Sequence, residues 1–474
     1  MANISSIVKN VRNIMRDEDR GISGDAQRLE QLGWMIFLKI LDEKDLELEC
    51  IREGYTSVIP EQFQWRSWAV DPEGLTGDEL LLFIDHPSDG LFAKLKNLNA
   101  PHHPQRASLV REVFDGLNNY MKSGFAMRKV INQLNGFDFN NSEDRHIFGT
   151  IYESILIELR DAGNKGEYYT PRAITQLMTQ MTNPTLGEKV LDPAAGTGGF
   201  LSAAIDYIRD SEVKTLDDEA VLQTSIAGWE YKPVAYVLGL TNLILHGLEV
   251  PDWHYRDSLK TEYNTIGPKQ QVDVILANPP FGAGIAEGVE TNFPASFRCR
   301  ESADLFVILM LQLLKPGGRC AIVLPDGCIT GDGYKARIRE KLLTDCNLHT
   351  IIRLPQSTFH PATVSTNLLF FQKGTPTKEI WYWEHQLPEG QKSYSKTKPI
   401  QFEEFTPLID WWDDREENEN AWKVSVDDLK AGFDLDVKNP VIPDDEEILS
   451  KGEIIAALRK SQVKIDSILQ GLEA

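Results

Sequence analysis

Cysteine is scarce in this sequence of 474 residues, with five copies and no Cys-x-x-Cys pair. An odd, scattered set excludes a disulfide framework and argues against a zinc cluster. We therefore expect buried or free thiols in a reducing compartment, and no metal site. The cysteines are Cys50, Cys299, Cys320, Cys328 and Cys346.

Long apolar runs are missing as well. The most apolar stretch near the N-terminus, residues 34–41, is interrupted by Lys39 and is far too short to cross a bilayer. The first residues reach Lys9 and Arg12 before any long apolar run, so we expect no signal peptide. Both absences predict a cytoplasmic protein without membrane contact.

Positive charge is in deficit, with 49 lysines and arginines against 71 acids and a net charge of −22. Such a charge repels phosphate backbones and argues against unaided nucleic-acid binding. Residues 401–474 carry 8 basic and 19 acidic side chains, which is half of the excess. The rest of the chain is only mildly acidic, so the net charge does not describe the surface around an active site.

The pattern of apolar residues divides the chain into regions. Apolar residues recur at three- and four-residue steps in 4–14 and 29–48, which predicts helices in an N-terminal region of about 150 residues. From about residue 187, short apolar runs alternate with helical stretches, which is typical of βαβ units and a mostly parallel sheet. Strands are expected at 189–191, 225–229, 272–277, 320–324, 350–354 and 368–372, and helices at 203–209, 233–246, 303–314 and 334–343.

The C-terminal part is polar and then acidic. The polar sequence begins after Gly374, and the run from Trp411 to Asp414 indicates a loop or an exposed segment. A last amphipathic helix carries apolar residues from Ile454 to Leu469. Such a helix either packs back on its own domain or fits a groove on a partner.

A glycine-rich turn follows the first expected strand, in the run Asp192-Pro193-Ala194-Ala195-Gly196-Thr197-Gly198-Gly199-Phe200. Glycines let the backbone approach a ligand, and the amides of the helix that follows can hydrogen-bond to it. The spacing matches neither the dinucleotide fingerprint nor a Walker phosphate loop, so a neutral or cationic ligand is favoured over a phosphate. A tight turn without a ligand is the alternative.

Two acids follow the glycine turn. Glu230 comes at the end of the second expected strand, where an acid can hold both ribose hydroxyls of a nucleoside. Asp257 follows Trp253-His254-Tyr255-Arg256 and has the right chemistry to accept a hydrogen bond from an adenine amino group. A solvated loop acid is the alternative for each of them.

The most specific motif is the run Asp273-Val274-Ile275-Leu276-Ala277-Asn278-Pro279-Pro280-Phe281-Gly282, an apolar strand that ends in Asn-Pro-Pro-aromatic. Two prolines stop the strand and make a rigid turn. The turn would aim the side-chain carbonyl of Asn278 and the backbone carbonyl of Pro279 at one spot, where they can bind both hydrogens of an NH2 group. Phe281 can stack on the plane of a base. A proline-capped loop with a buried asparagine is the alternative.

Asn278-Pro279-Pro280-Phe281 resembles the catalytic motif of S-adenosylmethionine-dependent amino-methyltransferases, and the turn from Asp192 to Phe200 resembles their cofactor loop. Upstream, the run Lys165-Gly166-Glu167-Tyr168-Tyr169-Thr170-Pro171-Arg172 resembles the methionine-side segment of one subfamily, the modification (methyltransferase) subunits of type I restriction–modification systems. The resemblance extends from the N-terminal helical region to about residue 374.

The resemblance implies an α/β fold with a Rossmann-like methyltransferase sheet, an N-terminal all-helical domain (1–150), a catalytic domain (151–400) and an acidic C-terminal region (401–474) whose helical tail docks a partner. It implies S-adenosylmethionine as cofactor and Asn278, Pro279, Pro280 and Phe281 as the catalytic residues around a flipped adenine. The implied cofactor-binding residues are Glu167, Tyr168, Tyr169, Thr170, Pro171, Arg172, Asp192, Ala195, Gly196, Thr197, Gly198, Glu230, Asp257 and Ser258.

The implied activity is adenine-N6 methylation of double-stranded DNA. No cysteine lies beside the Asn-Pro-Pro motif, which argues against the thiolate chemistry used on cytosine C5. The implied partners are a specificity subunit that selects the site, DNA reached through the complex, a restriction nuclease or translocase subunit, and a second copy of this chain. Two alternatives remain open: a related enzyme acting on RNA or on a protein glutamine amide, and a non-catalytic scaffold.

Overall fold

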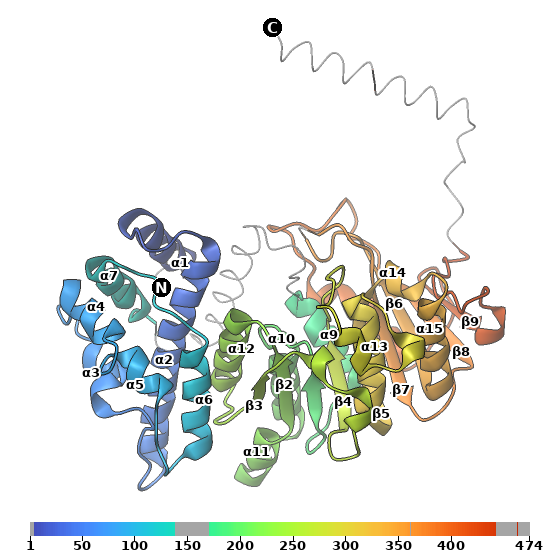
Figure 1. Ribbon diagram of the computed structural model, residues 1–474. Coiled ribbons are helices and arrows are strands. Elements are labelled where there is room, and N and C mark those ends of the chain that lie inside the picture. Colours follow the sequence, from blue (N-terminus) through green and yellow to red (C-terminus); the bar gives the residue numbers. More distant parts are fainter. Residues whose placement is uncertain (1–3, 138–169, 361, 442–461, 463–474) are drawn as a thin grey trace.

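The computed structural model describes residues 4–137, 170–360, 362–441 and 462. In this part of the chain a body of helices lies beside a nine-stranded sheet that is flanked by further helices (Figure 1). The predicted α/β class and the N-terminal helical region are confirmed. The amphipathic helix expected between 454 and 469 falls outside the described residues, apart from Gln462. Every described helix is too short or too polar to cross a membrane.

The N-terminal body is built around α2 (Asp25–Ile51), whose middle turns are apolar on every side. Trp34, Phe37 and Leu41 are at most 2% exposed, because other helices surround this part of α2. Lys39, which interrupts the apolar run, forms an ion pair with Glu43 one turn later. The other helices are α1 (Ile4–Asn13), α3 (Trp65–Trp68), α4 (Gly77–Asp85), α5 (Leu91–Lys96), α6 (Pro104–Asp115) and α7 (Gly124–Leu134).

The sheet has the strand order β3-β2-β1-β4-β5-β7-β6-β8-β9. Strands β3, β2, β1, β4 and β5 run parallel, whereas β7 is antiparallel to both β5 and β6. β8 pairs parallel with β6, and β9 pairs antiparallel with β8. The strands are β1 (Val190–Asp192), β2 (Ile226–Glu230), β3 (Asp252–Tyr255), β4 (Val272–Ala277), β5 (Leu314–Pro325), β6 (Cys346–Leu354), β7 (Thr366–Lys373), β8 (Glu379–Glu384) and β9 (Ala421–Ser425).

The strand order reverses between β1 and β4, and this reversal fixes where a ligand can bind. The chain steps outward from β1 to β3 and then returns to β4 on the other side of β1. Right-handed crossovers therefore put the helices after β1 and β2 on one face of the sheet and the helix after β4 on the other. A crevice opens at the carboxyl ends of the two strands at such a reversal.

Helices cover the sheet on both faces. The helix α9 packs on α10, and α13 packs on α15. The bounds are α9 (Arg172–Thr182), α10 (Gly199–Glu212), α11 (Leu216–Gln223), α12 (Pro233–Leu245), α13 (Ser302–Leu313), α14 (Asp326–Ile329), α15 (Tyr334–Asp345) and α16 (Thr406–Trp412).

The polar sequence after Gly374 forms further elements of the sheet domain, β8, α16 and β9. The prediction that Trp411 lies in a loop or an exposed segment is wrong: Trp411 lies in α16, one residue before its end, and is 7% exposed. Its indole packs on the rings of Trp381 and Trp383 in β8, with centroids 5.5 and 5.1 Å away. Burying these aromatic surfaces outweighs the acidic composition of the surrounding sequence.

The sheet continues past residue 400, since β9 forms its last strand. The chain then turns back, and Arg339 of α15 holds the returning segment. The guanidinium of Arg339 is 3% exposed and donates to the carbonyls of Gly432 and Phe433 at 2.7 and 2.8 Å. The described residues from 401 to 441 are thus an integral part of the sheet domain.

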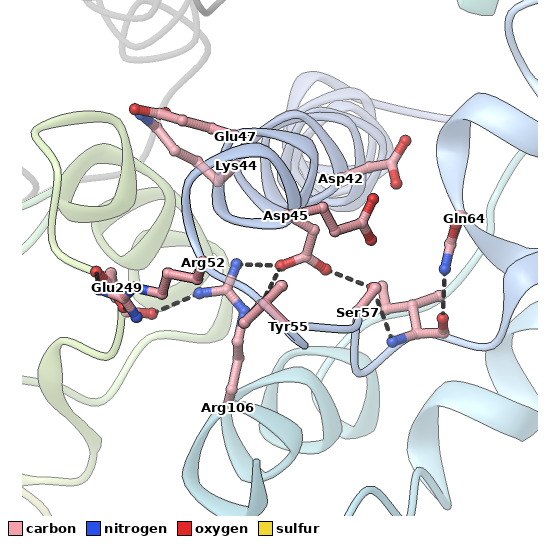
Figure 2. A network of polar contacts seen from close by, with 12 residues as sticks. Asp42, Lys44, Asp45, Glu47, Arg52, Tyr55, Ser57, Gln64, Arg106 and Glu249 are labelled. Carbon is pink, nitrogen blue, oxygen red and sulfur yellow. Dashed lines mark hydrogen bonds and ion pairs between the residues drawn. The ribbon is translucent and has the colours of Figure 1, made fainter. Parts of the chain in front are cut away.

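The helical body joins the sheet domain through α2 and α6, which face α12. Tyr236 of α12 donates to Glu112 of α6 at 2.8 Å. Next to this contact, Figure 2 shows a polar network in which Arg106 donates to Asp45 of α2 and to the backbone carbonyl of Glu249, at 2.6 and 2.8 Å. One buried arginine therefore links two N-terminal helices to the loop that follows α12.

A buried histidine after β8 predicts a loss of stability in acid. His385 is 7% exposed, and burial lowers its pKa to about 4 although Glu404 acts in the opposite direction. The unfolded chain binds this proton more readily, so the stabilisation is complete above the ordinary histidine pKa of 6.5 and is lost as the pH falls to about 4.

We expect His385→Gln to remove this pH dependence, since a glutamine amide can still donate to Tyr394, which lies 3.1 Å from the histidine ring nitrogen. Between about pH 7 and pH 4.5, the wild type should lose up to about 3 kcal/mol more unfolding free energy than the variant. Urea unfolding at several pH values measures the difference. Parallel pH profiles of the two proteins would contradict the prediction.

Candidate active site

The glycine-rich turn follows β1 at the strand reversal, as the sequence predicted. Asp192 ends β1, is 1% exposed and accepts a hydrogen bond from the backbone amide of Ala194 at 2.9 Å. Burial raises the pKa of Asp192 well above its ordinary value, and nearby Glu230 adds to the effect. Gly196 and Gly198 adopt φ values of 54° and 76°, where a side chain would be strained.

Glu230 ends β2 and faces this turn. Its carboxylate is 7% exposed and accepts the backbone amides of Gly196, Tyr231 and Lys232 at 2.7–2.8 Å. Burial raises the pKa of Glu230, while the three amides oppose that rise. The side chain is therefore not a solvated loop acid. A carboxylate has roughly four acceptor positions, and the backbone amides occupy three of them. Glu230 therefore keeps one position for a ligand hydroxyl, and not the two needed to hold both ribose hydroxyls.

The strand pair β2–β3 is held by a tryptophan that the sequence reading did not single out. Trp253 is 2% exposed, and its indole nitrogen donates to the carbonyl of Tyr236 at 2.9 Å. A Cβ atom on Gly228 or on Gly239 would lie 2.3 Å from the indole ring. Both positions therefore require glycine. The glycine at 239 lets α12 come close to the glycine turn. The sequence signal that could have found this contact is a glycine within β2 and another within α12, shortly before the tryptophan of β3.

Asp257 and Ser258 follow β3 and lie beside the glycine turn. Asp257 caps a short 3-10 turn by accepting the amide of Leu259 at 3.1 Å. Ser258 is buried and donates its hydroxyl to the carbonyl of Pro193. The chain therefore brings the end of β3 to the end of β1. Asn242 of α12, which the sequence reading missed, donates to the carbonyl of Thr197 at 3.1 Å in the same turn.

The Asn-Pro-Pro-Phe motif begins at the end of β4, directly across the strand reversal from the glycine turn. The amide nitrogen of Asn278 donates to the hydroxyl of Thr170 at 2.9 Å. The carbonyl oxygen of Asn278 is buried and has no hydrogen-bond partner among the described residues. An orphaned acceptor costs about 1–3 kcal/mol unless a ligand donates to it.

The rest of the motif is held in place by the fold. The hydroxyl of Ser302, at the start of α13, donates to the carbonyl of Pro280. Phe281 is 6% exposed and packs in the hydrophobic core, so its ring lies mostly inside the protein. Phe359, whose ring could have been a second contact for the base, is 1% exposed and belongs to this core.

The upstream segment reaches the motif through its last residues. Thr170 contacts Asn278, Pro171 caps the N-terminus of α9, and Arg172 is the first residue of that helix. The other predicted members of this segment, Glu167, Tyr168 and Tyr169, lie outside the described residues.

A cavity of about 690 Å³ lies beside these elements. It is lined by residues of α9, α10, α12 and α2, and it includes Thr170, Arg172 and Thr197. Asn278, Glu230 and Asp257 do not line it. The predicted site residues therefore meet at one edge of the sheet without sharing this single cavity.

Known proteins resemble the chain over most of its length. The sequence matches the family described as N-6 DNA Methylase over residues 143–448. It is 49% identical to the type I restriction enzyme EcoEI methylase subunit of Escherichia coli, over 94% of this chain and 94% of that protein.

Solved structures show the same similarity. One is a modification subunit assigned to a type I restriction enzyme of Vibrio vulnificus YJ016, with a TM-score of 0.83 and 42% identity, covering 92% of this chain and 96% of that one. Another comes from work on complex assembly and conformational transition of the type I restriction–modification system. It has a TM-score of 0.79 and 33% identity, covering 100% of this chain and 98% of that one.

Proposed function

Since the chain belongs to the N-6 DNA methylase family and to the methylase subunits of type I restriction enzymes, we propose that it methylates a flipped adenine as the catalytic subunit of a type I restriction–modification complex. The family and its relatives make the chain an adenine-specific DNA methyltransferase, which removes RNA bases, protein amides and a non-catalytic scaffold as leading alternatives. The observation that carries the proposal is the buried, unpartnered carbonyl oxygen of Asn278 at the end of β4.

The proposed methyl donor is S-adenosylmethionine, which when bound supplies a methyl group already activated on a sulfonium. The residues fit such a ligand: Gly196 and Gly198 keep the turn open to a close approach, and Glu230 retains an acceptor position. In the proposed arrangement, Glu167 to Arg172 and Ala195 to Gly198 hold its methionine part, Glu230 its ribose, and Asp257 with Ser258 its adenine.

The proposed role of the Asn-Pro-Pro motif is to accept both hydrogens of the adenine amine. The lone pair of that amine is delocalised into the ring, which makes it a poor nucleophile. Hydrogen bonds to the carbonyls of Asn278 and Pro279 favour a pyramidal, more electron-rich nitrogen. Positioning and fixed dipoles then supply most of the rate enhancement. Flipping the base out of the duplex costs a few kcal/mol. Stacking on Phe281 would offset part of this cost only if its ring, which is 6% exposed, became uncovered as the base enters.

In this proposal the specificity subunit provides the DNA binding. A net charge of −22 disfavours binding of a phosphate backbone by this chain alone. The proposed assembly also contains two copies of this chain and a restriction nuclease or translocase subunit. Because its substrate is cellular DNA, we place the protein in the cytoplasm.

The test is a transfer assay with tritium-labelled S-adenosylmethionine, run on this chain alone and with its specificity subunit. We expect label in duplex DNA only when both proteins are present, and label at N6 of adenine after digestion. RNA and protein substrates offered in parallel should stay unlabelled. Site-specific methylation at full rate by the isolated chain would overturn the partner requirement, and label in RNA or protein would overturn the substrate.

A further inference from the structure

The side-chain amide of Asn278 has two ends with opposite hydrogen-bonding character, and only one end is satisfied. Its nitrogen donates to the Thr170 hydroxyl at 2.9 Å, while its oxygen is buried without a partner among the described residues. Rotating the amide by half a turn would exchange the two ends. The oxygen would then take the Thr170 hydroxyl hydrogen, and the nitrogen would occupy the buried position that has no partner among the described residues.

The two orientations differ in what they can bind. In that unpartnered position an oxygen accepts a hydrogen from an incoming amine, whereas an NH2 group meets the amine donor to donor. Only the first orientation supports the proposed chemistry. In that orientation the nitrogen must find an acceptor inside the protein, because a buried unpaired donor is costly. Thr170 is the acceptor that the fold provides.

We propose that Thr170 is a positioning residue for the methyl transfer, acting through Asn278 by accepting its amide nitrogen and thereby turning its carbonyl oxygen toward the substrate amine. This inference rests on the proposed function and deepens it, because it gives Thr170 a role other than contact with the cofactor. Thr170 precedes α9, and Asn278, 108 residues later, directly follows β4. The contact therefore couples the segment before α9 to the catalytic turn.

The test compares Thr170→Val, which keeps the shape and removes the hydroxyl, with Thr170→Ser, which keeps the hydroxyl. In the complex with the specificity subunit, we expect Thr170→Val to lower kcat about 10–100-fold, since one hydrogen bond in a buried site is worth roughly that factor. The Kd for S-adenosylmethionine, measured by calorimetry, should change less than about threefold, and Thr170→Ser should recover most of kcat.

Two results would overturn the proposal. One is a Thr170→Val enzyme whose Kd for the cofactor rises tenfold while kcat at saturating cofactor is unchanged, because Thr170 would then be a cofactor contact. The other is a serine variant as slow as the valine variant, because the hydroxyl would then be irrelevant. A wild-type complex that leaves DNA unlabelled would instead refute the proposed function.

A measurement that does not depend on activity distinguishes failure of the positioning role from failure of the proposed function. Thr170→Val, Asn278→Ala and the double variant are compared by thermal unfolding without any substrate. If the hydroxyl and the amide interact, the double variant should lose less than the sum of the two single losses. Additive losses would show that the two side chains do not interact, and would overturn the positioning role whatever the substrate.

Discussion

Replacing Asn278 by alanine is expected to lower the rate of methyl transfer to DNA by at least about 10²–10³-fold, which is the typical cost of removing one preorganised hydrogen-bonding group from an active site. The variant loses the buried carbonyl oxygen that is the proposed acceptor for the substrate amine. The adenine nitrogen then keeps its lone pair in the ring, and nothing aligns it with the methyl group.

The loss should affect kcat and not cofactor binding, because Asn278 follows β4 while the predicted cofactor turn follows β1. Single-turnover transfer of label to duplex DNA measures the chemical step, and calorimetry measures the Kd for S-adenosylmethionine. Asn99→Ala, at an exposed position in the N-terminal body, serves as the control and should behave as wild type. If Asn278→Ala retains a near-normal transfer rate, the catalytic assignment is wrong.

Replacing Arg106 by methionine is expected to lower the unfolding free energy by about 3–5 kcal/mol. Asp45 is completely buried and Arg106 is 4% exposed, with 2.6 Å between the guanidinium and the carboxylate. Tyr55 and Ser57 also donate to Asp45 (Figure 2). Without Arg106, the carboxylate charge stays buried with only neutral donors, and the carbonyl of Glu249 loses its partner.

Two further variants distinguish the destabilisation caused by an uncompensated buried charge from the destabilisation caused by losing any arginine. Adding Asp45→Asn to Arg106→Met removes the uncompensated charge and keeps an acceptor for Tyr55, so the double variant should be more stable than Arg106→Met alone. Arg52→Met breaks an ion pair with Glu249 whose side chains are 51% and 35% exposed, and should cost less than about 1 kcal/mol.

Denaturant unfolding of the four proteins gives these differences directly. Equal losses for Arg106→Met and Arg52→Met would mean that burial does not strengthen the junction between the helical body and the sheet domain. A double variant no more stable than Arg106→Met would mean that the lost packing, and not the unpaired charge, causes the effect.

Most strands of the parallel half of the sheet could be predicted from the sequence. The expected strand at 272–277 coincides with β4, and those at 189–191 and 225–229 lie one residue from β1 and β2. Buried parallel strands are short, continuous apolar runs, and glycine or proline turns mark their ends. The strands β3, β8 and β9 escaped detection. β3 leaves His254 and Tyr255 exposed, β9 lies in polar, acidic sequence, and the short aromatic run of β8 is bounded by polar residues on both sides.

The sequence by itself determined the chemistry of this protein: the apolar strand that stops at Asn278, the double proline that fixes the turn, and the glycine turn after Asp192. Each is a local matter of backbone conformation and side-chain type, which neighbouring residues settle.

Only the tertiary structure decided which way the Asn278 amide is held, how many acceptor positions Glu230 keeps, and why Gly228 and Gly239 must be glycine. Each of these depends on a contact between residues far apart in the chain. Such contacts exist only after the strand order has brought β1, β2 and β4 together, and no local pattern records that order. The sequence therefore named the proposed catalytic and cofactor-binding groups, and the fold set their orientation and their free hydrogen-bonding positions.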